Sequence, residues 1–342
     1  MRTQGVAVVL LAILHCAAAG AEGLESTSPG LIGERPNAGG GPTEVSVDVY
    51  LFDIDEINDV TQRFNVDMFV DVEWLDERLA LPANQQSGGN RTLPLDNIWT
   101  PRGLIINDRG LSTQLPRVAE VDDLGNVKYV QRLSGEMAAD LEYADFPFDI
   151  QRLPIDIVSY RYSPDELSFS AKGRIRGDVD AFSEEGWRFT ILEPEIGTLS
   201  IPGEHIVRPR VTFLVEGERN TRYYVWTMFL PMTLIVFMSW TAFWLQPNLV
   251  PPRVGISTAT VFSLIAFGFS IRVSLPPVPY LTRADTLVVG CTLLVFLSLA
   301  VTVIGSRWAS DDRMGAALRL NAIARWAYAA LFFLVIAVAL LR

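Results

Sequence analysis

The chain has 342 residues, 49% of them hydrophobic, and a mean hydropathy of +0.25, which is high for a soluble protein and predicts membrane segments. Its net charge is −11, yet from Arg222 onward only three acids stand against nine arginines, so the front half is strongly acidic and unsuited to binding nucleic acid. Two cysteines and two histidines argue against a Cys/His metal site, and no nucleophile–base pair or phosphate loop predicts an enzyme or a cofactor.

The N-terminal residues 1–21 are typical of a secretory signal peptide. Arg2 precedes the apolar run Val6–Leu14, and Ala19-Gly20-Ala21 provides a small-residue cleavage site. A lipid anchor on Cys16 is the alternative, which the preceding histidine fits poorly. Residues 22–43 are rich in Gly, Pro and Ser and predict a flexible segment without a core.

Residues 44–221 change to short runs of alternating apolar and polar residues, separated by turn signals. Each run predicts a strand; they are VSVDVYLFDI, FNVDMFVDVEW, VKYVQRL, IQRLPIDIVSY, WRFTILE and HIVRPRVTFLV. No long helical period interrupts them. We therefore predict an antiparallel β-sandwich that faces the periplasm or the exterior.

Residues 222–342 contain four apolar segments of spanning length, at about 223–245, 254–273, 286–305 and 322–341. A helix needs about 20 such residues to cross the hydrocarbon core, so a four-helix, multi-pass domain in the cell (inner) membrane is predicted. With the sandwich outside, the connections 246–253 and 306–321 lie inside, and both carry arginine, as the positive-inside bias requires.

The second span, within 251–280, carries more hydroxyls than a lipid-facing helix needs: Ser257, Thr258, Thr260, Ser263, Ser270 and Ser274. One chain of four spans cannot enclose a pore. A symmetric ring of copies could, with each copy contributing its second span, about residues 251–273. A membrane-anchored sandwich whose helices only pack together remains the alternative at this point.

Short motifs occur along the chain in this order: Trp74–Leu79, Leu95–Pro101, Phe146–Gln151, Arg219-Asn220, Pro231, Ser239-Trp240, Phe243-Trp244, Leu275-Pro276 and Pro279-Tyr280. In these motifs and their order, the whole mature chain resembles the pentameric ligand-gated ion channels, the Cys-loop receptor superfamily, and most closely its bacterial members. Two departures stand out. Ala139 and Leu153 replace the disulfide cysteines of eukaryotic receptors, and Arg102 replaces the Asp that commonly follows W-x-P.

The resemblance implies a sandwich of about ten strands over a four-helix bundle, assembled as a homopentamer in membrane lipid. A small-molecule agonist would bind between adjacent sandwiches and open a path for inorganic ions. The matched ligand-binding positions are Phe69, Ile106, Tyr129, Tyr160 and Tyr162. Because Ile106 is not aromatic and residues 194–204 contain no aromatic, the ring box that holds quaternary amines is incomplete. Ordinary strand packing is the alternative for each position.

The same resemblance implies a coupling set between sandwich and membrane, formed by Asp59, Asp149 and Arg219 with Pro147, Pro276 and Tyr280. An arginine between two carboxylates can bond both through its forked donors. Rearrangement of this set could transmit ligand binding, or the set could be static and only stabilise the fold.

For the pore helix, the helical spacing of the hydroxyls and the family resemblance predict different faces toward the pore axis. Ser257, Thr260, Ser263 and Ser270 share one broad side, which water would favour. The family register instead turns another face to the axis: Gly255, Ala259, Phe262, Ala266, Phe269 and Val273. We follow the register, which predicts a gate of two phenylalanine rings that closes by dewetting and places the hydroxyls against neighbouring helices. Plain helix packing is the alternative for both phenylalanines.

Selectivity is the least determined property. Pro251, Pro252 and Arg253 begin a sequence similar to the P-A-R-V-G mouth of eukaryotic anion channels, and no glutamate ring is present there. The acidic sandwich would instead concentrate cations. We expect a slight preference for anions. The alternatives are a cation-selective channel, a proton-gated channel of the same family that uses carboxylates with raised pKa, and a non-conducting membrane-anchored sensor of small molecules.

Overall fold

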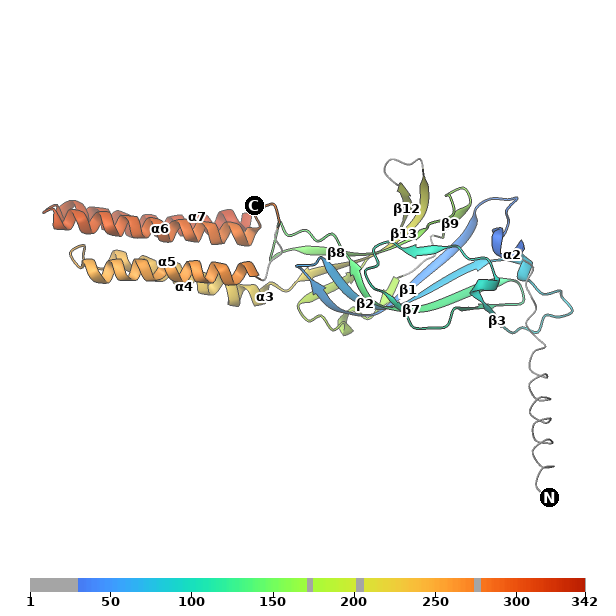
Figure 1. The fold of residues 1–342 in the computed structure, drawn as a ribbon. Coiled ribbons are helices and arrows are strands. Elements are labelled where there is room, and N and C mark those ends of the chain that lie inside the picture. The colour runs from blue at the N-terminus through green and yellow to red at the C-terminus, as the bar shows by residue number, and fades with distance from the viewer. Residues whose placement is uncertain (1–29, 171–174, 201–205, 274–277, 342) are drawn as a thin grey trace, which may run out of the picture.

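The computed structural model describes residues 30–170, 175–200, 206–273 and 278–341. The strands form one body, and the long helices extend from it as a second (Figure 1). The predicted signal peptide lies outside the described residues, as do Pro276 and the end of the 194–204 loop. After the short helix α2 (Gly30–Gly33) the chain enters the sandwich.

The larger sheet has the strand order β10-β1-β2-β7-β6-β3, with β5 paired to β7 and β9 paired to β1. Its strands are β1 (Thr43–Asn58), β2 (Arg63–Leu75), β3 (Arg91–Pro94), β5 (Ser112–Thr113), β6 (Val118–Val121), β7 (Asn126–Ala138), β9 (Leu167–Phe169) and β10 (Ile175–Gly177). The short strands β9 and β10 run parallel to β1. The sheet is therefore mixed and not wholly antiparallel as predicted, because the chain after β8 crosses back and joins the β1 edge in the direction of β1.

The smaller sheet has the order β11-β13-β8-β4, with β12 also paired to β13. Its strands are β4 (Gly103–Ile105), β8 (Ile150–Ser159), β11 (Trp187–Ile191), β12 (Glu195–Ser200) and β13 (Val207–Arg219). Alternate residues of the long strands are buried, as a two-fold period requires, and the core between the sheets holds large side chains such as Trp99, Phe64 and Phe213. The described residues contain thirteen strands, more than the ten or so predicted.

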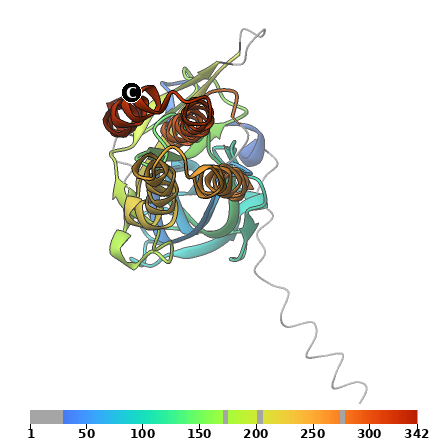
Figure 2. The same ribbon diagram turned by 90° about the vertical axis from the view of Figure 1, so that its left-hand side faces the viewer.

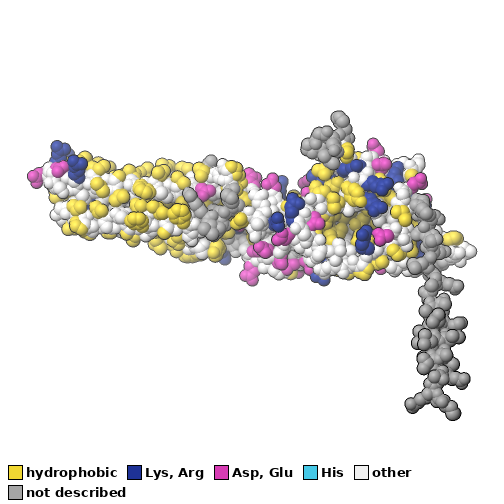
Figure 3. Space-filling model, in the orientation of Figure 1, with side chains coloured by type: hydrophobic (Ala, Val, Ile, Leu, Met, Phe, Trp, Pro, Cys, Tyr) yellow, Lys and Arg dark blue, Asp and Glu magenta, His cyan; other side chains and the backbone are white. Residues whose placement is uncertain are grey.

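Four helical spans follow. The first combines α3 (Thr221–Tyr224), the π-helical stretch η4 (Val225–Phe229), α4 (Leu230–Thr241) and the short turn η5 (Ala242–Trp244), and the others are α5 (Val250–Val273), α6 (Arg283–Ser310) and α7 (Met314–Leu341). Each span is long and apolar enough to cross a membrane. Seen end-on they form a bundle (Figure 2), and their surface is mostly hydrophobic, with charges gathered at the far end (Figure 3). The π-helical stretch η4 ends at Phe229, two residues before Pro231. Proline has no backbone N–H to donate to the regular helical hydrogen-bond pattern.

Local backbone geometry in β7 gives a test of the sandwich. Gly135 has φ +141°, and a Cβ placed on it would lie 2.4 Å from the carbonyl oxygen of Gly110. Gly135→Ala is therefore expected to cost about 1–3 kcal/mol of stability from strain, and more from the clash. Gly197→Ala is the matched control, because a Cβ at Gly197 meets nothing within 4 Å. Thermal unfolding of the detergent-extracted protein should separate the two variants, and equal melting temperatures would contradict this account.

Candidate functional site

A buried ion cluster lies where the sandwich meets the helices. The guanidinium of Arg219, at the end of β13, donates from Nε and Nη2 to Asp149 at 2.9 and 3.1 Å. It donates from Nη1 and Nη2 to Asp59 at 2.8 Å each. Only 3% of the Arg219 side chain is exposed, against 2% for Asp149 and 18% for Asp59. The structure thus brings together the three charged residues named from the sequence, in a forked arrangement that contacts both carboxylates.

Aromatic rings enclose this cluster. The Arg219 guanidinium lies 4.2 Å from the ring centre of Trp187 and 5.0 Å from that of Phe146. Burial alone lowers the pKa of Arg219, but the hydrogen bonds to Asp59 and Asp149 outweigh it and raise the pKa, so the cation persists at any working pH. Burial raises the pKa of Tyr143, whose hydroxyl stays protonated and donates to the Asp59 carbonyl at 2.8 Å.

The segment 139–149 rests directly on the membrane helices. The backbone N–H of Tyr143 donates to the hydroxyl of Tyr280 at 3.1 Å. Asp145 forms a 2.8 Å ion pair with Arg283 at the start of α6, and the ring of Phe148 stacks on that of Phe229. Pro147, in the same segment, is buried. Of the residues predicted for coupling, Pro276 alone lies outside the described part of the chain.

Two of the predicted ligand-binding residues lie at the ends of neighbouring strands of the smaller sheet. Tyr160, just after β8, is 52% exposed, and Ile106, just after β4, is 36% exposed. The turn that Arg102 occupies is held by the neighbouring strand, because Ser159 Oγ donates to the Pro101 carbonyl at 2.6 Å and the Tyr160 N–H donates to the Arg102 carbonyl at 3.2 Å. Strand pairing therefore fixes this turn where the family has Asp.

Phe69 lies on a different surface, the outer face of the larger sheet. Its ring lies 5.2 Å from that of Phe52, and the guanidinium of Arg132 approaches both rings at 5.6 and 5.9 Å. Arg132 also forms a forked ion pair with Asp67 at 3.0 and 2.6 Å. Sequence reasoning missed Phe52, Asp67 and Arg132. The cross-strand pairing of Phe69 with Arg132 would have indicated them, had the register of β2 and β7 been known.

Two predicted ligand residues do not lie on these surfaces. Tyr162 is 6% exposed, and its hydroxyl accepts a hydrogen bond from Trp99 Nε1 at 2.7 Å, so it is part of the core. Tyr129 pairs across the strands with Val72, packs against the core and accepts from Gln131 at 3.1 Å. Because side chains alternate along a strand, Tyr129 faces away from the surface that carries Phe69.

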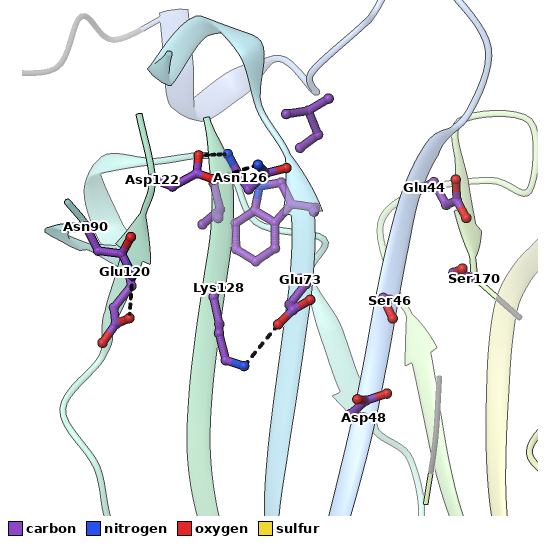
Figure 4. A pocket seen from close by; sticks show the side chains of 13 residues that line it. Glu44, Ser46, Asp48, Glu73, Asn90, Glu120, Asp122, Asn126, Lys128 and Ser170 are labelled. Carbon is purple, nitrogen blue, oxygen red and sulfur yellow. Dashed lines mark hydrogen bonds and ion pairs between the residues drawn. The ribbon is translucent and has the colours of Figure 1, made fainter. Parts of the chain in front are cut away.

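A polar hollow of about 620 Å³ lies on the outer face of the larger sheet, away from the membrane helices (Figure 4). Its charged lining residues are five acids and Lys128, which forms ion pairs with Glu73 at 3.0 Å and Asp71 at 3.2 Å. No group of three or more His, Cys, Asp or Glu side chains among the described residues is arranged to hold a metal ion.

On the pore-helix candidate α5, the exposed and buried faces are distinct. Phe262 is 68% and Phe269 67% exposed, and the small residues Gly255, Ala259 and Ala266 are exposed on the same face. The side chain of Val273 lies outside the described part. Ser257 and Thr260 are fully buried, and Ser257 Oγ contacts Thr302 Oγ1 of α6 at 3.4 Å. Two of the hydroxyls that first suggested a wet path therefore face a neighbouring helix.

The inner end of α5 differs from the expected basic mouth. Pro251 and Pro252 are exposed, but Arg253 is 0% exposed. Its guanidinium points into the bundle, where it donates to the Ala242 carbonyl at 3.2 Å and to Asn321 Oδ1 at 2.6 Å. In the chain as described, Arg253 therefore does not line a mouth, because the neighbouring helices supply acceptors that draw it inward.

Comparison with known proteins fits this architecture. Residues 32–205 match the model of the neurotransmitter-gated ion-channel ligand binding domain, and residues 228–320 match that of the neurotransmitter-gated ion-channel transmembrane region. The chain therefore belongs to the neurotransmitter-gated ion-channel family, whose members are receptor channels and not enzymes. A relative is the gamma-aminobutyric acid receptor subunit beta-4 of Gallus gallus, 28% identical over 276 residues, which are 78% of this chain. The chain spans about half of that relative, 55% of its length.

The ion cluster yields a graded prediction. Asp149→Asn removes a carboxylate whose partner Arg219 is almost wholly buried, which is expected to cost about 3–5 kcal/mol. Asp59→Asn should cost less, because the Asp59 side chain is 18% exposed and water replaces part of the lost interaction. Denaturant unfolding of the extracted protein measures both. A larger loss for Asp59→Asn would contradict the burial argument.

Proposed function

We propose that the chain is a ligand-gated ion channel that assembles as a homopentamer, with α5 of each copy lining the pore. The observation that carries the proposal is the exposed face of α5, where Phe262 and Phe269 lie among small residues while Ser257 and Thr260 are turned inward. Family membership supports it, because the match covers both a ligand-binding and a transmembrane region. In this proposal residues 44–221 bind the ligand outside the cell or in the periplasm, residues 222–342 conduct, and residues 1–21 direct export to the inner membrane.

The ligand site in this proposal lies between two copies. Tyr160 and Ile106 follow the neighbouring strands β8 and β4 of the smaller sheet, and Phe69 lies on the outer face of the larger one. Surfaces on different faces of one sandwich meet when adjacent copies are related by a rotation axis, since a head-to-tail ring joins unlike faces. Phe52 and Arg132, which contact the Phe69 ring, extend the second surface.

The ligand is a small molecule, and gamma-aminobutyric acid is the first compound to test because a relative carries it in its name. For selectivity, we retain the slight preference for anions. It rests on the absence of acidic residues between Arg222 and Asp285 in the sequence. With the Arg253 side chain turned into the bundle, a basic ring does not support the preference.

Substitutions at the two tyrosines near the end of β8 distinguish a role in ligand binding from a role in core packing. Tyr160→Ala should weaken the response to an agonist at least tenfold and leave thermal stability nearly unchanged, because Tyr160 is 52% exposed. Tyr162→Ala, the control, removes a core ring and should destabilise by about 3–5 kcal/mol. Concentration–response curves and melting temperatures test both. An agonist response that survives Tyr160→Ala unchanged would count against the site.

The gate is tested at Phe262. Phe262→Ala should ease opening, because a ring of alanines in a wider constriction stays wet where a ring of phenylalanines dewets. The variant is recorded in lipid bilayers with asymmetric salt, so that its reversal potential also reports ion selectivity. Lost or unchanged current in a normally assembled oligomer would contradict the gate. A folded oligomer that never conducts in a broad ligand and pH screen would instead favour the non-conducting sensor.

A further inference from the structure

The buried guanidinium of Arg253 is the least expected feature of the helix bundle. It is 0% exposed in the first turn of α5, where the positive end of the helix dipole also disfavours a cation. Every acceptor that it contacts in the described part of the chain is neutral, and its Nη1 has no hydrogen-bond partner there. A cation in this environment is costly. Ionisable groups within membrane spans are therefore candidates for a functional role.

Asn321 of α7 contacts this cation, and its hydrogen bonds determine the orientation of its side-chain amide. Its Oδ1 accepts from Arg253 Nη2 at 2.6 Å, while its Nδ2 donates to the carbonyls of Phe243 at 2.9 Å and Leu245 at 3.1 Å. Exchanging the amide oxygen and nitrogen would place an N–H against the guanidinium and an oxygen against two carbonyls. One side chain, 6% exposed, thus joins α7, the end of the first span and the inner end of α5.

This bond bridges two helices that otherwise pack on other partners. α5 packs against α4, η5 and α6, whereas α7 packs mainly against α6 and η5. Among the hydrogen bonds of the described residues, the one from Arg253 to Asn321 joins a side chain of α5 to a side chain of α7. Gly305 of α6 lies beside this bond, and a Cβ there would make an ordinary contact with Arg253 Nη1 at 3.8 Å.

We propose that Asn321 is a positioning residue for α5: the inner end of α7 holds the inner end of α5 in place through the Asn321–Arg253 hydrogen bond. The inference rests on the proposed function only in taking α5 as the pore helix. If α5 lines the pore, the outermost helix then controls the position of the inner mouth without itself touching the pore.

The test compares Asn321→Leu with Asn321→Asp in the full chain. The two replacements are close to Asn in size, and both lose the donations to Phe243 and Leu245. Only Asp keeps an acceptor for Arg253, to which it would form a charge-assisted bond. The difference between them therefore isolates the bond to the pore helix from the rest of the Asn321 contacts.

The readout is amide hydrogen exchange by mass spectrometry on the purified oligomer. Asn321→Leu should speed exchange of the first α5 turns, residues 250–257, by about tenfold, and Asn321→Asp should leave it near the wild-type rate. By reciprocity, Arg253→Leu should loosen α7 around residues 317–325. If Leu and Asp speed exchange equally, or if Asn321→Leu loosens α7 alone, the proposal is overturned.

A recording arm separates this inference from the proposed function. In the Phe262→Ala background, Asn321→Leu should change open probability and leave the reversal potential unchanged, while Asn321→Asp should restore the open probability. A merely structural role would lower the number of channels and not their open probability. If no variant conducts but the predicted exchange pattern is observed, the result supports Asn321 as a positioning residue for α5 and contradicts the channel proposal.

Discussion

The junction of the two bodies depends on a single side chain, Arg219. It is the last residue of β13, and α3 begins two residues later. Its two carboxylate partners come from distant segments: Asp59 follows β1, and Asp149 closes the loop that rests on α6 and the first span. Removal of either carboxylate would leave the remaining charges uncompensated in a poorly solvated place. The cluster therefore ties the loop that contacts the helices to the ends of β1 and β13, and the partly exposed Asp59 is the partner whose loss costs least.

Within the described part of the chain, two buried arginines are stabilised in opposite ways. Arg219 is compensated by two carboxylates and aromatic faces, whereas Arg253 has only the neutral oxygens of Ala242 and Asn321. The first arrangement gives a stable joint at the outer end of the bundle. The second gives a weaker joint at the inner end, where breaking one hydrogen bond to a neutral acceptor costs less than separating an ion pair.

The sequence predicts the large features of this fold, because two periods dominate it: alternation in the sandwich and long apolar runs in the helices. Strands of two to four residues, such as β5 and β9, are too short to show a period, which is why the strand count was low. The face on which Tyr129 lies could not be read from the sequence, because facing depends on register and a one-residue shift exchanges the two faces of a strand. The burial of Arg253 could not be read for a different reason. No pattern in α5 reveals that Asn321, 68 positions later, offers it an acceptor.

The hydroxyls of α5 do not share one environment, because Ser257 and Thr260 are buried while Ser263 and Ser270 are exposed. In an apolar helix a hydroxyl need not reach water, since it can donate to a carbonyl one turn earlier, as Thr260 does to Ser257 at 2.8 Å, or meet a neighbour, as Ser257 meets Thr302. Burying such a satisfied hydroxyl costs little. Phenylalanine has no such internal partner, so Phe262 and Phe269 must be covered by something outside the chain: lipid, a second copy, or the axis of a ring of copies. Small residues at Gly255, Ala259 and Ala266 lie on the same face and would let five such faces approach one another closely. A helix built for lipid alone has no need of them.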